Sequence, residues 1–139
     1  MSAADRRPLP QLTPENRAFW TGGEHGRLMI HRCEACGHWI HPPSPICPHC
    51  RARDVSPHAA SGRGTVATFT INQQPWRPTM RVPFVVAIVE LDEQRGLRLT
   101  TNLVNVAPDA VRIGQRVRVV FERHDDVWLP LFEPDPAPP

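Results

Sequence analysis

Apolar and polar residues alternate with a period of two through the second half of the chain, which is typical of β-strands that bury one face. The alternation predicts five strands, at residues 65–72, 83–91, 97–104, 116–121 and 127–132. The strand at 83–91 is a continuous apolar run, so we expect it to be buried on both faces. Pro130 lies within the last strand and indicates an edge strand or a bulge, because proline cannot donate a ladder hydrogen bond.

In three of these strands the alternation also assigns a face to the side chains. The predicted inward residues are Ala67, Phe69 and Ile71, then Leu97, Leu99 and Leu103, then Val117, Val119 and Phe121. Arg116 and Arg118 fall on the opposite, outward face. Five short strands in roughly 70 residues predict a small antiparallel barrel, and the five-stranded OB-fold agrees in strand count and size.

The first half of the chain contains one short segment with helix signals. Thr13 followed by Pro14 predicts a helix start, because threonine caps a helix and proline at the first helical position loses no needed donor. Gly22 and Gly23 are expected to end this helix, just after Phe19 and Trp20. A helix shorter than about 12 residues is marginal alone. It must therefore dock on this chain or on a partner.

All four cysteines lie between these two regions, in two C-x2-C pairs separated by ten residues: Cys33, Cys36, Cys47 and Cys50. Each pair can fold as a knuckle that turns two sulfurs toward one point, and four thiolates complete a tetrahedral zinc site. Gly37 supplies the positive φ that such a turn needs. The N-terminus has no apolar run of a secretion signal, which favours a metal over disulfides.

A site with four cysteine ligands is closed, so we expect the zinc to be structural rather than catalytic. Iron in a rubredoxin-like redox site is the alternative metal, because sulfur tetrahedra accept both. Four histidines lie near the cysteines, and we interpret them as surface or supporting residues rather than a second metal site: His31, His38, His41 and His49.

These patterns predict a mainly β chain in four parts. An N-terminal arm and helix occupy residues 1–26, and a rubredoxin-like zinc ribbon occupies residues 27–60. The OB-fold follows at residues 61–133, and residues 134–139 form a tail that we expect to be disordered.

Composition narrows the chemistry of this 139-residue chain. All sixteen basic residues are arginine and there is no tyrosine. Schiff-base lysine and phosphate-loop lysine chemistry on this chain are therefore excluded. No apolar run approaches the roughly 20 residues of a membrane span, so we expect a cytoplasmic protein. The formal net charge of +2 falls to zero when four thiolates bind one zinc ion, which disfavours nonspecific nucleic-acid binding.

Two features of the barrel sequence leave their interpretation open. Trp76 lies in a proline-rich loop between the first two predicted strands, where it could anchor a partner or cover the barrel. Four arginines could form a basic face, although solvated or partner-facing charge is the simpler reading: Arg98, Arg112, Arg116 and Arg118.

The order of a short helix ending in Phe19-Trp20, a ribbon and a barrel resembles one known family. This is the acyl-CoA-associated family of rubredoxin-like zinc ribbon plus OB-fold, "domain of unknown function 35". The resemblance extends over roughly residues 14 to 133. Its most specific stretches are the cysteine pairs with Ser61-Gly62-Arg63-Gly64-Thr65-Val66, then Pro83 to Leu91 and Ile113 to Val117.

This resemblance implies a noncatalytic accessory subunit or domain, with no catalytic residue on this chain. The implied partner is a thiolase-superfamily protein, such as a lipid-transfer-type aldolase, or a MaoC-like hydratase, within a complex that binds a CoA thioester. The INQQPW loop is similar to that of members serving steroid side-chain degradation, in which this domain is the C-terminal part of an enoyl-CoA hydratase subunit that recruits a retro-aldolase. We expect Phe19, Trp20 and Trp76 to contact the partner. The alternatives are a nucleic-acid-binding module, or more weakly an electron carrier.

Overall fold

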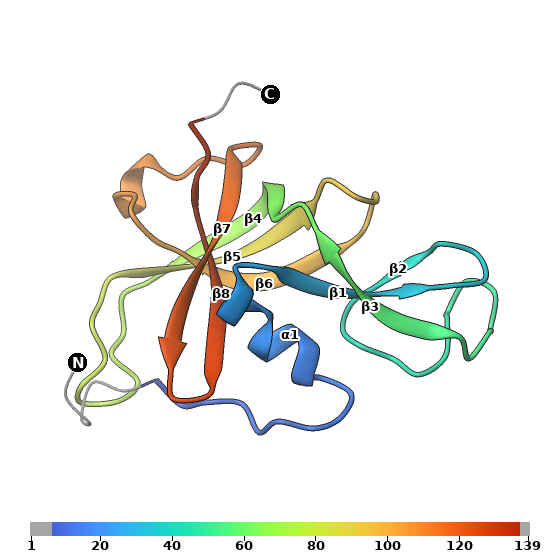
Figure 1. Cartoon of the computed structure of the whole chain (residues 1–139). Helices are drawn as coiled ribbons and strands as arrows, with labels where there is room; N and C mark the ends of the chain where they lie inside the picture. The colour runs from blue at the N-terminus through green and yellow to red at the C-terminus, as the bar shows by residue number, and fades with distance from the viewer. Residues whose placement is uncertain (1–6, 137–139) are drawn as a thin grey trace.

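The computed structural model describes residues 7 to 136 and contains two β-structures with one short helix beside them (Figure 1). The helical elements are α1 (Arg17–Thr21), η2 (Gly22–His25) and η3 (Pro108–Ala110). The strands are β1 (Leu28–Cys33), β2 (Trp39–Ile40), β3 (Val55–Ala60), β4 (Arg63–Asn72), β5 (Phe84–Leu91), β6 (Arg98–Leu103), β7 (Arg116–His124) and β8 (Val127–Pro134).

Strands β4 to β8 close into a barrel in the order β4-β5-β6-β8-β7, which confirms the predicted OB-fold. The expectation of a wholly antiparallel barrel is wrong at one junction, because β6 and β8 pair in parallel through Leu103 and Phe132. A ring of five strands cannot alternate direction at every neighbour, since the number is odd. One parallel pair is therefore a geometric consequence of closing this barrel.

The predicted inward faces are found in the barrel with one shift of register. Leu97, Leu99 and Leu103 are buried, as is Val117. In β4 the pairing with β5 shifts between Val66 and Thr68, so a bulge moves the inward positions from even to odd numbers. Val66 is consequently fully buried upstream of the bulge, although the sequence pattern did not place it inward.

Strand β5 differs from the expectation of burial on both faces. Alternate residues are fully buried: Val85, Ala87, Val89 and Leu91. The side chains between them, including Val86 and Ile88, are only partly buried. One face of this apolar strand therefore lines the core, and the other face is partly exposed.

Pro130 lies inside β8, opposite Phe121 of β7. β8 is not an edge strand, because the barrel is closed on both of its sides. Its pairing with β6 consists of the single pair Leu103 and Phe132. The Thr101 hydroxyl donates a 2.9 Å hydrogen bond to the Pro130 carbonyl, and this side-chain contact joins β6 and β8 beside that pair.

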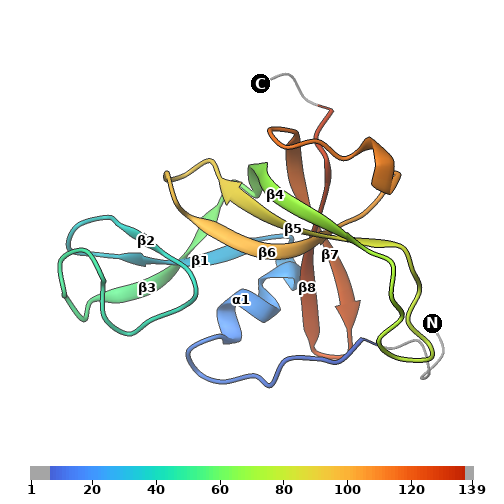
Figure 2. The same ribbon diagram turned by 180° about the vertical axis from the view of Figure 1, so that it is seen from behind.

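Strands β2, β1 and β3 form a separate antiparallel sheet, the ribbon, which extends from one side of the barrel (Figure 2). The central strand β1 contributes to two cores. Its first residues, Leu28 and Ile30, belong to the core of the barrel, and its last residue, Cys33, belongs to the small core of the ribbon. One continuous strand thus connects the ribbon rigidly to the barrel.

The prediction that Thr13 caps the helix is wrong, because residues 14–16 form a turn and α1 begins at Arg17 with Asn16 as its N-cap. The Asn16 backbone donates to the Thr13 hydroxyl, and the Thr13 backbone donates in return to the Asn16 side chain at 2.7 Å. The end differs, because the glycines at 22 and 23 continue α1 into η2, which stops at Gly26 with φ of +68°. A Cβ on Gly23 would lie 2.4 Å from the Trp128 Cβ, so this glycine permits η2 to pack on β7 and β8.

Both ends of the described chain are tied to the barrel. Arg7 of the arm binds side chains of β6 and β7, and the Asp135 backbone donates to the Arg116 carbonyl. β8 itself runs to Pro134, one residue beyond the predicted end of the OB-fold. The start of the arm (residues 1–6) and the end of the predicted tail (residues 137–139) lie outside the described residues. No helix within residues 7–136 is long and apolar enough to cross a bilayer.

Candidate functional site: a four-cysteine metal centre

The four cysteine sulfurs converge at the outer end of the ribbon. The Sγ atoms of Cys33, Cys36, Cys47 and Cys50 all lie within 4.8 Å of one another. Cys33 and Cys50 sulfurs are 3.5 Å apart, and Cys36 and Cys47 sulfurs are 3.7 Å apart, with no disulfide among them. Sulfurs bound to one tetrahedral zinc at about 2.3 Å are separated by about 3.8 Å. The four positions therefore suit one tetrahedral zinc ion.

Each cysteine pair forms a tight turn that directs its two sulfurs inward. In the first, the Gly37 backbone donates to the Cys33 carbonyl, and Gly37 has the expected positive φ of +79°. In the second, the equivalent bond runs from the Arg51 backbone to the Cys47 carbonyl. Arg51 also has a positive φ, +66°, which a non-glycine residue rarely adopts. Because this residue is an arginine, its type alone does not reveal the second left-handed position, which glycine usually occupies.

Backbone donors favour the thiolate form of Cys47. The N–H groups of His49 and Cys50 point at its sulfur from 3.4 and 3.5 Å. Burial by itself raises the pKa of this thiol, but these donors and the neighbouring cysteines outweigh it and lower the pKa to about 7. Since a metal binds the thiolate, the turn prepares this ligand for zinc.

The nearby histidines surround the site without completing a second one. His38 and His49 stack with ring centroids 5.1 Å apart, beside the metal centre. His41 packs on Phe19 at 4.8 Å, and its buried Nδ1 atom has no hydrogen-bond partner. Burial, followed by the charge of His31, lowers the pKa of His41 to about 4. His41 is thus a neutral packing residue. Within residues 7–136 the four cysteines are the only cluster that could hold a metal ion.

A hydrogen-bonded bridge fixes the ribbon against the barrel. The Gln94 side chain, from the turn between β5 and β6, accepts from the Trp39 backbone N–H at 2.9 Å and donates to the Trp39 carbonyl at 3.0 Å. The side chain thus extends the ribbon sheet as a backbone would. The sequence pattern did not reveal this contact, because its two residues are 55 positions apart.

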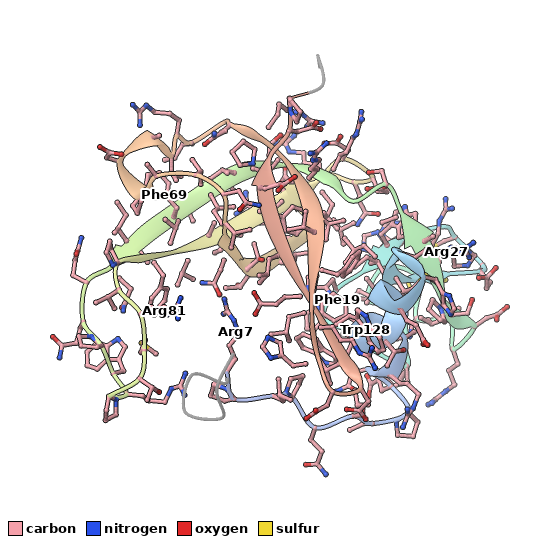
Figure 3. All side chains as sticks on the ribbon, turned by 60° about the vertical axis from the view of Figure 1, so that its left-hand side comes forward. Arg7, Phe19, Arg27, Phe69, Arg81 and Trp128 are labelled. Carbon is pink, nitrogen blue, oxygen red and sulfur yellow. The ribbon has the colours of Figure 1, made fainter. Side chains whose placement is uncertain are left out.

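The three aromatic residues expected to contact a partner differ in exposure. Phe19 is only 7% exposed and packs in the barrel core, and Trp20 is partly buried against the same core. Trp76 is 71% exposed at the β4–β5 loop, where its indole N–H donates to the Asn72 side chain. Figure 3 shows Phe19 near β8, which carries Trp128. Partner contact stays a prediction, and Trp76 is the best placed of the three.

The four arginines considered as a basic face are each engaged by groups of this chain. Arg116 forms two hydrogen bonds with Asp92, Arg118 pairs with Glu133, and Arg98 pairs with Glu90. Arg112 donates to the backbone carbonyls of Asp109 and Val111. Because three of these charges are neutralised locally, these four arginines do not form an unbalanced basic stripe for nucleic acid.

Comparisons with known proteins agree with this architecture. A family model described as "ChsH2, rubredoxin-like zinc ribbon domain" matches residues 20–56, and one described as "ChsH2, C-terminal OB-fold domain" matches residues 57–122. A solved structure titled "Ltp2-ChsH2(DUF35) aldolase" superimposes with a TM-score of 0.81 and 38% identity, covering 91% of this chain and 98% of that chain. The chain belongs to the DUF35 family.

Two curated relatives of this DUF35 chain carry enzyme-subunit names. The "probable enoyl-CoA hydratase alpha subunit" of Thermomonospora curvata is 40% identical over 92% of the chain. The "3-oxo-4,17-pregnadiene-20-carboxyl-CoA hydratase alpha subunit" of Mycobacterium tuberculosis is 36% identical over 94% of it. The chain covers only 40% and 41% of the length of these two relatives. The four-cysteine cluster lies within the segment that matches the rubredoxin-like zinc ribbon model.

Proposed function

We propose that the chain is a noncatalytic accessory subunit or domain that binds and stabilises a thiolase-superfamily, lipid-transfer-type aldolase acting on an acyl-CoA. The observation that carries this proposal is the likeness, over nearly the full length of the matched chain, to the DUF35 component of a structure titled as an aldolase. The metal centre supports it, because four cysteine ligands leave zinc no open position for substrate.

The names of the curated relatives suggest which class of acyl-CoA the complex acts on. One relative is named for a pregnadiene carboxyl-CoA, which is a steroid with a shortened side chain activated as a CoA thioester. We therefore place this chain in steroid side-chain degradation in the cytoplasm, in a hetero-oligomer that holds the CoA thioester. Within that assembly, zinc organises the ribbon, and this chain's own residues provide the docking surface.

Trp76 is the residue we assign to partner contact. A tryptophan that is 71% exposed offers a large apolar surface that a partner can bury. Its indole is already oriented by Asn72, so binding loses little side-chain freedom. Trp20 offers a second, half-buried contact, and Phe19 supports Trp20 by edge-on packing at 4.8 Å.

The test is co-expression of this chain with a thiolase-superfamily aldolase encoded by the same host, followed by affinity purification and native mass spectrometry. We expect a complex of fixed stoichiometry that cleaves the acyl-CoA, and no turnover by this chain alone. Turnover by the isolated chain, or the absence of any such complex, would contradict the proposal.

A matched pair of variants locates the interface. Trp76→Ala should weaken the complex by about 2 kcal/mol or more, as expected for a tryptophan hot spot. Ile113→Ala removes another exposed apolar side chain, which is 69% exposed. Ile113 lies in the connection between β6 and β7, which hydrogen-bonds to Val66 at the end of β4 far from Trp76. This control should bind as the unmodified chain does.

A further inference from the structure

A cleft with a volume of about 490 Å³ lies between the N-terminal arm, the β4–β5 loop and the wall of the barrel. It falls within the usual size of small-molecule sites, about 300–1,000 Å³. None of its residues takes part in the metal centre. Its lining combines four apolar residues with three arginines: Met80, Phe84, Leu103 and Val104, and Arg7, Arg77 and Arg81.

Arg7 is held in place by two hydrogen bonds from its guanidinium. Its Nε donates to Glu122 at 3.0 Å and its Nη1 donates to the Asn102 side chain at 2.7 Å. Asn102 is itself fixed, because its amide donates to the Val85 carbonyl at 2.9 Å. A guanidinium has five N–H donors, so three remain for a ligand.

Arg81 faces Arg7 across the cleft from the β4–β5 loop, as Figure 3 shows. The side chain is exposed, and within residues 7–136 its guanidinium forms no hydrogen bond or ion pair. It therefore differs from Arg98, Arg116 and Arg118, whose charges are satisfied by carboxylates of this chain. Arg81 keeps all its donors for a ligand.

The charged groups of the lining are three arginines and one carboxylate. The carboxylate, Glu122, pairs with Arg7 at 3.0 Å. Glu122 is further engaged by His124, whose Nε2 lies 2.6 Å from the same carboxylate oxygen that Arg7 binds. The single negative group of the lining is thus engaged by Arg7 and His124, and Arg81 has no carboxylate partner within residues 7–136.

We propose that this cleft binds a ligand that carries a phosphate or carboxylate group on an apolar body. The anion lies between Arg7 and Arg81, where planar guanidinium groups match its oxygens, and the apolar body covers Phe84 and Leu103. The site acts without a partner protein, so it stands or fails independently of the accessory role.

The test uses the zinc-loaded full chain and two small probes of equal apolar size, phenyl phosphate and benzoate. Calorimetric titration at low salt should give saturable one-site binding of one of them in the millimolar range or tighter. Backbone NMR shifts should change at residues 80–84 and 102–104. Tighter binding of phenyl phosphate assigns the site to a phosphate, and tighter binding of benzoate assigns it to a carboxylate.

Arg81→Ala should weaken the preferred probe about tenfold, as for the loss of a charged hydrogen-bond pair. Arg27→Ala is the matched control, because Arg27 is equally exposed and lies on the opposite side of the molecule (Figure 3). Glu122→Gln keeps an acceptor for Arg7 but removes the only negative charge of the lining. It should tighten binding roughly twofold to fivefold.

Two results would overturn the proposal. The first is the absence of saturable binding of either probe at low salt. The second is an equal loss of affinity in Arg27→Ala and Arg81→Ala, which would show that only the overall charge attracts the probe.

Discussion

The ribbon and the barrel are stabilised in opposite ways although one strand runs through both. The barrel buries a continuous cluster of fourteen residues, with Val89, Val117 and Phe132 at 0% exposure. The buried residues of the ribbon core are Cys33, Ile40 and Cys47, and two of these belong to the four-cysteine cluster. A core of that size cannot offset the entropy of ordering the ribbon, so metal binding must supply the difference. The barrel needs no such cross-link.

Removing the metal should produce the largest effect and should separate the two regions. Chelation removes a contribution of about 10–16 kcal/mol to folding of the ribbon, and Cys47→Ala weakens it by removing one of the four ligands. We expect the β1–β3 pairing near Cys33 to be lost while the barrel strands stay folded, as measured by zinc content and backbone NMR. Ser44→Ala, a change in the same loop that spares all four sulfurs, should keep both zinc and ribbon. Unchanged NMR chemical shifts of the ribbon residues after chelation would contradict the view that the ribbon, unlike the barrel, depends on the metal.

Truncating the barrel core should produce the reverse pattern. Phe132 is fully buried where β8 meets β6, so Phe132→Ala should lower the free energy of unfolding by about 3–5 kcal/mol. Denaturant unfolding measures this loss, and the zinc stoichiometry of the folded fraction should not change. Ile113→Ala, which removes an exposed apolar side chain, should change stability by less than about 0.5 kcal/mol. A loss of zinc in Phe132→Ala would show instead that the ribbon core depends on the barrel core.

We expect the contact between the ribbon and α1, where His41 packs on Phe19, to be sensitive to acid. His41 has a folded pKa of about 4 against an ordinary value of 6.5, so only the unfolded chain binds its proton between these pH values. Stability is therefore full above pH 6.5 and falls by about 3 kcal/mol as the pH drops to 4.

His41→Phe should remove this part of the loss, which denaturation curves at pH 7 and pH 5 will measure. Both proteins release zinc in acid, and the difference between them isolates the imidazole. His25→Gln, a substitution at the exposed end of η2, serves as the control. Identical pH dependence in His41→Phe and the unmodified chain would contradict the assignment.

The smallest expected effect concerns the bridge between the two regions. Gln94→Ala removes both hydrogen bonds to the Trp39 backbone, which should cost about 1–2 kcal/mol. NMR residual couplings should then report a looser ribbon orientation with the zinc still bound. Gln73→Ala, in the exposed β4–β5 loop, is the matched control and should leave the orientation unchanged.

What could be predicted from the sequence is what short-range patterns encode. The cysteine spacing predicted the cluster, and two-residue alternation predicted the five barrel strands and the inward leucines of β6. The bulge in β4 was missed, because no glycine marks it and it depends on pairing with β5.

Contacts between distant residues were beyond these patterns. Arg7 meets Glu122 across 115 positions, so neither residue carries a local sign of the cleft. The pairing of Arg116 with Asp92 likewise turns a candidate basic face into a neutral one. One parallel strand pair could be predicted without any side-chain information, because a closed barrel with an odd number of strands requires it.

Strand β1 gives the molecule the mechanics of a lever. Because Leu28 and Ile30 are clamped in one core and Cys33 in the other, force applied at the zinc end is transmitted along the backbone to the barrel rather than absorbed in a flexible joint. A protein that binds the ribbon therefore also sets the orientation of the barrel, with its cationic cleft and Trp76.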